Sequence, residues 1–193
     1  MAKTDKKAFY EDIVMAGFGG QGLMFIGKLL AYSAMKEGKH VTWIPSYGPE
    51  MRGGTANCTI VISSEEIGSP VTLHPHSLIV MNNPSMETFE PRLQSNGVLL
   101  LSSSFVNRPV TRSDIIVLAV PASEIAASAG TDRAANMVML GAYIGMTKVV
   151  AKESIIDGLK ELFGKKIDLF ETNVRAFEEG LLFASQKPTK QGS

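Results

Sequence analysis

Apolar runs of strand length alternate with longer amphipathic stretches along this chain. The apolar or alternating runs lie at residues 13–16, 40–46, 55–63, 77–81, 98–101 and 114–120. Stretches with helical periodicity lie at residues 23–37, 85–93, 122–129, 133–147, 151–163 and 168–185. Apolar strands joined by helical crossovers are typical of a parallel sheet that is buried on both faces. The pattern therefore predicts a three-layer, Rossmann-like α/β domain with a mostly parallel sheet and helices on both faces.

One strand and one helix depart from this general pattern. The strand 55–63 alternates apolar and polar residues, and only the loop 47–54 separates it from the preceding strand. Because that loop is too short for a helical crossover, we expect this strand to be antiparallel. The helix 133–147 is apolar nearly all round, so it must be buried against the sheet or against a partner. Gly141 and Gly145 lie one turn apart on this helix, where a neighbouring backbone can approach closely.

Length and composition fit one ordinary α/β domain. We expect residues 10–185 of the 193 to form it, with a lysine-rich extension at 1–9 and a disordered polar tail at 186–193. Lysine plus arginine equal aspartate plus glutamate at 19 each, which gives no electrostatic case for binding nucleic acid. No apolar run is long enough to span a membrane and the N-terminus has no secretory signal, so we expect a cytoplasmic protein.

Few residues outside the glycine-rich segments carry candidate chemistry. Cys58 is the only cysteine, so the chain alone forms no internal disulfide, iron–sulfur cluster or thiolate zinc site. It shares a strand face with Ile60 and Ile62, which predicts a packed thiol rather than a reactive one. His74 and His76 lack a third ligand, so we expect no metal site. We assign no catalytic residue, because no Ser/His/Asp or paired-carboxylate arrangement is evident.

The most informative segment is a glycine-rich turn between the apolar run 13–16 and the helix 23–37. The spacing of a dinucleotide-binding turn is present in Gly17-Phe18-Gly19-Gly20-Gln21-Gly22. Glycines allow positive φ and close backbone approach, and the free N–H groups of the helix start favour an anion. An NAD site also needs an acidic residue about 20 positions further on, and the strand 40–46 has none. We therefore disfavour an autonomous NAD-dependent enzyme and interpret the turn as an anion-binding or structural element.

A second loop follows the second strand, at the sheet edge where ligands bind in open α/β folds. It holds Tyr47, Glu50 and Arg52 among glycines that include Gly53. A guanidinium at this edge suits a phosphate or a carboxylate. The alternative is a solvated loop in which Glu50 and Arg52 pair with each other.

Several motifs together resemble the gamma subunit of the 2-oxoacid:ferredoxin oxidoreductases, the family that acts on pyruvate, 2-oxoglutarate or ketoisovalerate. They are Gly17-x-Gly19-Gly20-Gln21-Gly22, Tyr47-Gly48-x-Glu50-x-Arg52-Gly53-Gly54, Ile67-Gly68-Ser69-Pro70, Val120-Pro121-Ala122 and Ala135-Asn136-Met137-Val138-Met139-Leu140-Gly141. The resemblance covers residues 10–183, and the combined motifs are far more specific than the glycine turn alone.

The resemblance implies a subunit of an oxidoreductase that is inactive alone. Such complexes decarboxylate a 2-oxoacid on thiamine diphosphate, pass two electrons through iron–sulfur clusters to ferredoxin, and form acyl-coenzyme A. The resemblance puts thiamine diphosphate and the clusters on the alpha, beta and delta subunits, so contact with ferredoxin is indirect. This chain is implied to pack against the thiamine-binding subunits and to help accommodate coenzyme A. The alternative is a purely structural subunit, and the apolar late helices allow a homodimer when the chain is isolated.

The resulting hypothesis assigns coenzyme A to two neighbouring loops and one helix start. We expect backbone N–H groups of the glycine turn, and the Gln21 amide, to bind its pyrophosphate. Arg52 supplies charge and Glu50 orients it. Asn136 either contacts the ligand or caps the helix 133–147. The predicted binding residues are Gly17, Gly19, Gly20, Gln21, Gly22, Tyr47, Glu50, Arg52, Gly53 and Asn136.

Overall fold

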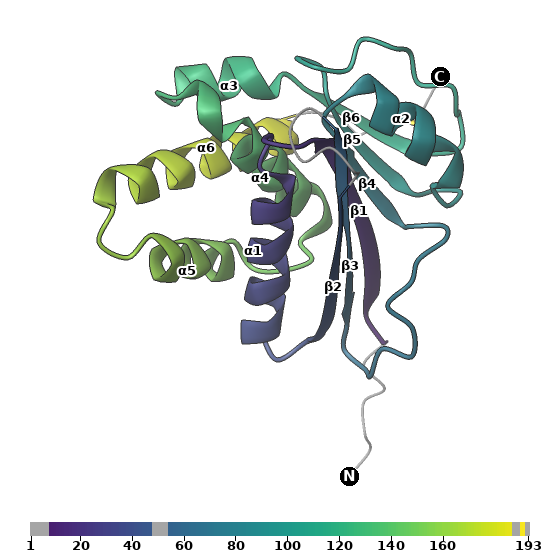
Figure 1. Cartoon of the computed structure of the whole chain (residues 1–193), viewed down its shortest axis with the longest axis horizontal. Coiled ribbons are helices and arrows are strands. Elements are labelled where there is room, and N and C mark those ends of the chain that lie inside the picture. The colour runs from purple at the N-terminus through teal and green to yellow at the C-terminus, as the bar shows by residue number, and fades with distance from the viewer. Residues whose placement is uncertain (1–7, 48–53, 187–189, 192–193) are drawn as a thin grey trace.

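A mixed sheet with helices against both of its faces forms the described part of the chain (Figure 1). The computed structural model describes residues 8–47, 54–186 and 190–191. The strands are β1 (Tyr10–Phe18), β2 (His40–Tyr47), β3 (Thr55–Ser63), β4 (Ser77–Val80), β5 (Val98–Ser102), β6 (Ile116–Val120) and β7 (Lys190–Gln191). The helices are α1 (Leu23–Lys36), α2 (Asn83–Phe89), η1 (Glu90–Arg92), α3 (Ala122–Ser128), η2 (Asp132–Ala134), α4 (Ala135–Thr147), α5 (Lys152–Phe163) and α6 (Ile167–Gln186).

The strand order is β2-β3-β1-β4-β5-β6-β7, and the long strands are mostly parallel. β1 pairs with β4, β4 with β5 and β5 with β6 in parallel, whereas β3 runs antiparallel to both β1 and β2. The antiparallel direction predicted for residues 55–63 is thereby confirmed. The tail differs from the disorder expected for 186–193 at three residues, because Gln186 ends α6 and Lys190–Gln191 pairs with the outer edge of β6. Among the described residues no other strand pairs with that edge of β6.

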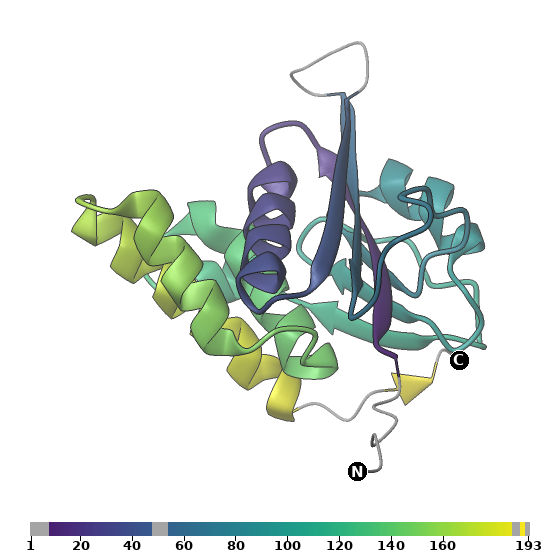
Figure 2. The same cartoon turned by 90° about the horizontal axis from the view of Figure 1, so that it is seen from below.

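Alternate residues of the central strands divide the core into two parts, as a strand with both faces covered requires. Ile13 and Met15 of β1 face the larger core with α1, α4 and α6, while Val14 and Ala16 face the smaller core with α2. The turned view shows α5 and α6 on the same side of the sheet as α1 (Figure 2). The predicted layers are confirmed, although the α2 side carries far less helix than the α1 side (Figure 1).

Glycines allow α4 and α6 to pack with their backbones in contact. A Cβ atom on Gly141 would lie 2.0 Å from the carbonyl oxygen of Phe177, and one on Gly180 would lie 2.1 Å from that of Val138. α4 is buried along most of its length between the sheet and α6. The predicted close approach at Gly141 is therefore confirmed, and α6 is the backbone that approaches. None of the described helices is both long and apolar enough to cross a membrane.

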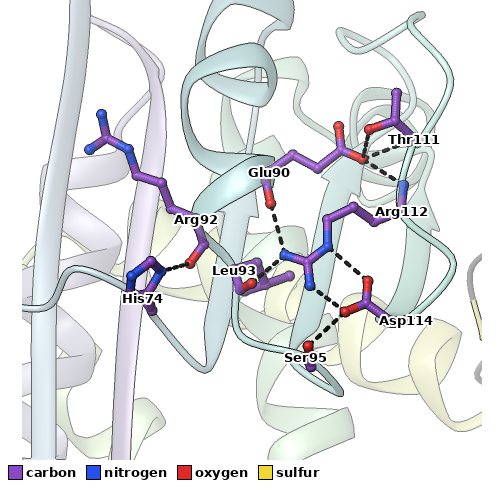
Figure 3. Close-up of polar contacts among 8 residues, drawn as sticks. All are labelled: His74, Glu90, Arg92, Leu93, Ser95, Thr111, Arg112 and Asp114. Atoms are coloured by element: carbon purple, nitrogen blue, oxygen red, sulfur yellow. Dashed lines mark hydrogen bonds and ion pairs between the residues drawn. The ribbon is translucent and has the colours of Figure 1, made fainter.

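A buried carboxylate fastens the segment between β5 and β6 to η1 (Figure 3). The Glu90 side chain accepts hydrogen bonds from the Thr111 N–H at 2.6 Å and from the Thr111 hydroxyl at 2.9 Å. The Arg112 guanidinium donates to the Leu93 carbonyl and forms two bonds with Asp114, at 2.8 and 2.5 Å. The Thr111 bonds satisfy the Glu90 carboxylate, which would be costly to bury alone. Together with the Arg112 bonds they stabilise the amino-terminal edge of β5 and β6.

Candidate functional site

The sheet has a topological switch point between β1 and β4. β1 leads into α1, which packs on the larger core, whereas β4 leads into α2, which packs on the opposite face (Figure 1). The two connections therefore diverge at the carboxyl ends of two adjacent parallel strands. In open α/β sheets such a divergence leaves the crevice in which ligands bind. The glycine-rich turn lies at this crevice, because it joins the end of β1 to the start of α1.

The turn depends on glycine at two positions with positive φ. Gly20 has φ of 101° and Gly22 has φ of 76°, values that L side chains rarely adopt. Gly22 is the N-cap of α1, and the first turn of α1 holds no acidic residue. The first N–H groups of the helix have no intrahelical acceptor and lie at the positive end of its dipole. The predicted strand, turn and helix are confirmed, and their geometry suits an anion.

Gln21 ties the turn to the neighbouring strand. Its Oε1 accepts a hydrogen bond from the Phe18 N–H at 2.6 Å, and its Nε2 donates to the Met81 carbonyl at 2.9 Å. A Cβ atom on Gly17 would lie 2.4 Å from Oε1, which explains glycine at that position. Both polar atoms of the Gln21 amide therefore have partners within the chain. From the sequence we expected this amide to bind a pyrophosphate. In the structure it instead joins the glycine turn to the end of β4.

Asn136 joins the start of α4 to the start of α1. Its Nδ2 donates to the Gly22 carbonyl at 3.2 Å, and its Oδ1 accepts from the Met137 N–H at 3.0 Å. The side chain is buried, and a Cβ atom on Gly22 would lie 2.2 Å from Nδ2. The first turn of α4 also lacks an acidic residue. Asn136 thus holds two helix starts together, so that both positive dipole ends reach the same edge of the sheet.

Part of the second predicted loop lies outside the described residues. Glu50, Arg52 and Gly53 are in that part, and Tyr47 is described only as the last residue of β2. The positions of the two ends of the loop are nevertheless described, because Tyr47 pairs with Ala56 across the sheet. Gly19 of the first turn donates its N–H to the carbonyl of Gly54 at 3.0 Å. The loop therefore leaves and rejoins the sheet beside the glycine turn, as the sequence interpretation requires.

A pocket of about 460 Å³ opens at this edge. Its lining residues are Phe18, Gly19, Gly20, Gly22, Leu23, Met24, Phe25 and Ala56. Glycine backbone and a helix start make one part of the lining polar, while large apolar side chains make another part hydrophobic. Such a surface suits a ligand that carries both phosphate and apolar groups. Sequence reasoning found the glycines but missed the apolar side chains, which look like ordinary core residues in the pattern.

The end of β4 supplies polar residues that sequence reasoning also missed. Asn82 is buried, and its Oδ1 accepts from the Ser85 N–H at 2.8 Å to cap α2. Its Nδ2, and the Ser102 hydroxyl at the end of β5, have no partner among the described residues. The run Asn82-Asn83-Pro84 after an apolar strand was the available signal, because it is a helix start with proline in the first turn. In the structure this helix begins at Asn83, two residues before the start of the predicted helix 85–93.

The remaining candidates have structural partners. Cys58 is fully buried, and burial raises the pKa of its thiol to about 12, which confirms the packed interpretation. The His74 ring contacts the Arg92 carbonyl, while the His76 ring contacts Asp12 at 2.5 Å. Over the residues that the structure describes, no group of three His, Cys, Asp or Glu side chains is arranged to hold a metal ion.

Comparison with known proteins places this geometry in a family. Residues 12–183 match the model of the pyruvate ferredoxin/flavodoxin oxidoreductase family. The ketoisovalerate oxidoreductase subunit VorA of Methanothermobacter thermautotrophicus is 39% identical over 176 residues, which cover 90% of this chain and 36% of that protein. The chain thus spans about a third of the length of this relative.

Solved structures agree with that placement. The gamma subunit of a keto/oxoacid ferredoxin oxidoreductase from Geobacter sulfurreducens superposes with a TM-score of 0.81 at 27% identity, over 92% of this chain and 97% of that one. A 2-oxoglutarate:ferredoxin oxidoreductase from Magnetococcus marinus, solved with 2-oxoglutarate, coenzyme A and succinyl-CoA bound, shares the fold with a TM-score of 0.86. That match has 22% identity and covers 94% of this chain and 32% of that one. The chain belongs to the pyruvate ferredoxin/flavodoxin oxidoreductase family, which confirms its resemblance to the gamma subunits.

Proposed function

We propose that this chain is the gamma subunit of a thiamine-diphosphate-dependent 2-oxoacid:ferredoxin oxidoreductase, and that its glycine turn helps to hold coenzyme A. The assembled enzyme decarboxylates a 2-oxoacid to acyl-coenzyme A and passes the electrons to ferredoxin in the cytoplasm. Thiamine diphosphate and the iron–sulfur clusters belong to the alpha, beta and delta partners. The observation that carries the proposal is the pocket at the switch point, where a glycine backbone meets the start of α1.

The pocket fits the chemistry of coenzyme A. The N–H groups of Gly20 and Gly22 have no hydrogen-bond partner among the described residues, and the start of α1 adds further free donors. No carboxylate in the first turn of α1 competes for them. The apolar part of the lining, which includes Phe18 and Phe25, suits the uncharged portions of the same ligand. The coenzyme A bound in the Magnetococcus marinus enzyme adds support from a protein of the same fold.

The second loop completes the proposed site. In this proposal Arg52 supplies positive charge to the phosphates and Glu50 orients it, and Tyr47 and Gly53 are further candidate binding residues of the same loop. In support of this proposal, the loop that carries them rejoins the sheet at Gly54, whose carbonyl accepts the Gly19 N–H beside the pocket. Gln21 and Asn136 act as positioning residues that hold the turn and the two helix starts.

Gly20 offers a matched pair of variants for testing the phosphate role. Nothing lies within 4 Å of a Cβ atom placed there, so a side chain meets open space. Asparagine and aspartate both tolerate positive φ and have nearly the same shape, so Gly20→Asp and Gly20→Asn differ mainly in charge. We expect Gly20→Asp to raise the KM for coenzyme A in the assembled enzyme at least about tenfold above that of Gly20→Asn. Equal KM values for the two variants would refute the phosphate role.

A purely structural subunit is the second candidate, and one observation favours it. The amides of Gln21 and Asn136 are both used within the chain, as in a turn built only for packing. Arg52→Ala separates the two functions. The coenzyme A proposal expects a raised KM with intact assembly, whereas the structural one expects loss of assembly with unchanged coenzyme A affinity.

A further inference from the structure

The segment between β3 and β4, residues 64–76, presents two unusually exposed apolar side chains. We call this segment the β3–β4 strap. Leu73 is 73% exposed and Val71 is 66% exposed, more than any other large apolar side chain among the described residues. The strap also contains the Ile67–Pro70 motif, which the glycine-turn site does not use. It lies at the opposite end of β1 from the glycine turn, because it joins the partner of Tyr10 to the partner of Ile13.

The strap is fastened to the sheet directly between these two side chains. The Thr72 hydroxyl donates to the buried carboxylate of Asp12 at 2.8 Å. The same carboxylate accepts the His76 N–H at 2.7 Å. Thr72 therefore points inward, and the residues on either side of it are left facing solvent. The hydrogen bond between Thr72 and Asp12 therefore keeps Val71 and Leu73 facing outward.

The end of the strap has further anchors on the segment after η1. The His74 ring contacts the Arg92 carbonyl at 3.2 Å (Figure 3). Gln94 donates from its side chain to the His74 carbonyl at 2.7 Å and from its backbone to the Pro75 carbonyl at 2.9 Å. Binding through a segment that is already ordered loses little conformational entropy. Exposed apolar side chains on such a segment are suited to serve as interface anchors.

The charge of the strap restricts the kind of partner. It contains Glu65 and Glu66 but no lysine or arginine. Both glutamates are exposed, and neither forms an ion pair with the described residues. A complementary surface therefore offers an apolar pocket for the two anchors and basic side chains beside it.

We propose that the β3–β4 strap docks this chain onto a partner subunit of the oxidoreductase, with Val71 and Leu73 entering an apolar pocket that has a basic rim. The inference rests on the proposed role as a subunit, but not on the binding of coenzyme A. It assigns assembly to the end of β1 opposite the glycine turn, so the two roles use separate surfaces.

Competitive assembly tests this docking. The companion subunits of the oxidoreductase are co-expressed with equal amounts of wild-type and variant full-length chain. The ratio of the two chains in the purified complex is then measured by mass spectrometry. We expect Val71→Gln/Leu73→Gln to be depleted about 30-fold. Both side chains are still about two-thirds exposed or more before docking, and this fold-change corresponds to the apolar area that they would bury on the partner. The control Met35→Gln/Leu182→Gln changes two exposed apolar side chains on helices and is expected to enter the complex as the wild type does.

The outcomes separate the proposals. Equal incorporation of the strap variant and the helix control would overturn the docking inference. Glu65→Gln/Glu66→Gln should be depleted at low salt and recover as salt approaches about 0.5 M, and salt-independent incorporation would overturn the basic rim. Exclusion of the wild-type chain from the complex would overturn both the docking and the subunit role. If the strap variant is depleted but Gly20→Asp leaves the KM unchanged, only the coenzyme A role fails.

Discussion

Replacing Gly22 by alanine adds a methyl group where the Asn136 amide now lies. The new Cβ atom would be 2.2 Å from Nδ2, and φ at this residue is 76°. The left-handed backbone costs alanine about 1–2 kcal/mol. Displacing the amide adds about 1–3 kcal/mol of overpacking and about 1 kcal/mol for the lost hydrogen bond to the Gly22 carbonyl. We therefore expect Gly22→Ala to lower the free energy of unfolding by about 3–6 kcal/mol.

A double-mutant cycle with Asn136→Ala divides this cost into its parts. Asn136→Ala removes the amide and leaves the Cβ atom of residue 136 at 3.6 Å, an ordinary van der Waals contact, so only the backbone strain of about 1–2 kcal/mol should remain. The two substitutions should then be coupled by about 2–4 kcal/mol. Gly20→Ala is the control, because Gly20 also has positive φ but has nothing within 4 Å of its Cβ position. Its cost should be the same with and without Asn136.

Urea unfolding followed by circular dichroism measures all five variants against the wild type. The shift in midpoint at constant m-value gives each change in free energy. If Gly22→Ala and Asn136→Ala are additive to within about 0.5 kcal/mol, the two helix starts are not in contact and the geometry of the crevice is wrong.

Three further predictions concern other parts of the molecule. Gly141→Ala forces α6 away from α4 and should lower the free energy of unfolding by about 3 kcal/mol, measured in urea, whereas Gly68→Ala, which meets open space, should be nearly neutral. Because burial raises the pKa of Cys58 to about 12, iodoacetamide should label the unfolded chain at about pH 8 but not the native chain; rapid native labelling, detected by mass spectrometry, would contradict its burial. The Arg112 guanidinium holds the pKa of Asp114 well below its usual value, so the stability this pair contributes is present above about pH 4 and is lost as pH falls further. Asp114→Asn should therefore reduce the acid dependence of the urea midpoint, and an unchanged dependence would refute the coupling.

The fold could largely be predicted because its determinants are local. Apolar runs bounded by polar or turn-forming residues mark the central strands, and the short loop before β3 dictates its antiparallel direction. The contact of α4 with α6 was only half predictable. Gly141 predicted the close approach of another backbone, but nothing near it in the sequence identifies Phe177 as the neighbour.

The candidate site was less predictable because its hydrogen bonds join distant residues. Gln21 binds the carbonyl of Met81, 60 positions away, and Asn136 binds that of Gly22, 114 positions away. Both amides look available for a ligand until those partners are known. The crevice itself depends on α2 lying opposite α1, which is a property of the tertiary arrangement rather than of any motif.

Amide hydrogen exchange of the assembled enzyme, with and without coenzyme A, tests the central claim most directly. The amides of Gly20 and Gly22, and those of the first three residues of α1 (23–25), have no acceptor among the described residues and should exchange quickly without ligand. We predict that coenzyme A protects residues 20–25 and that pantetheine, which lacks the phosphates, does not. Saturation with coenzyme A that leaves exchange in the glycine turn unchanged would contradict the account.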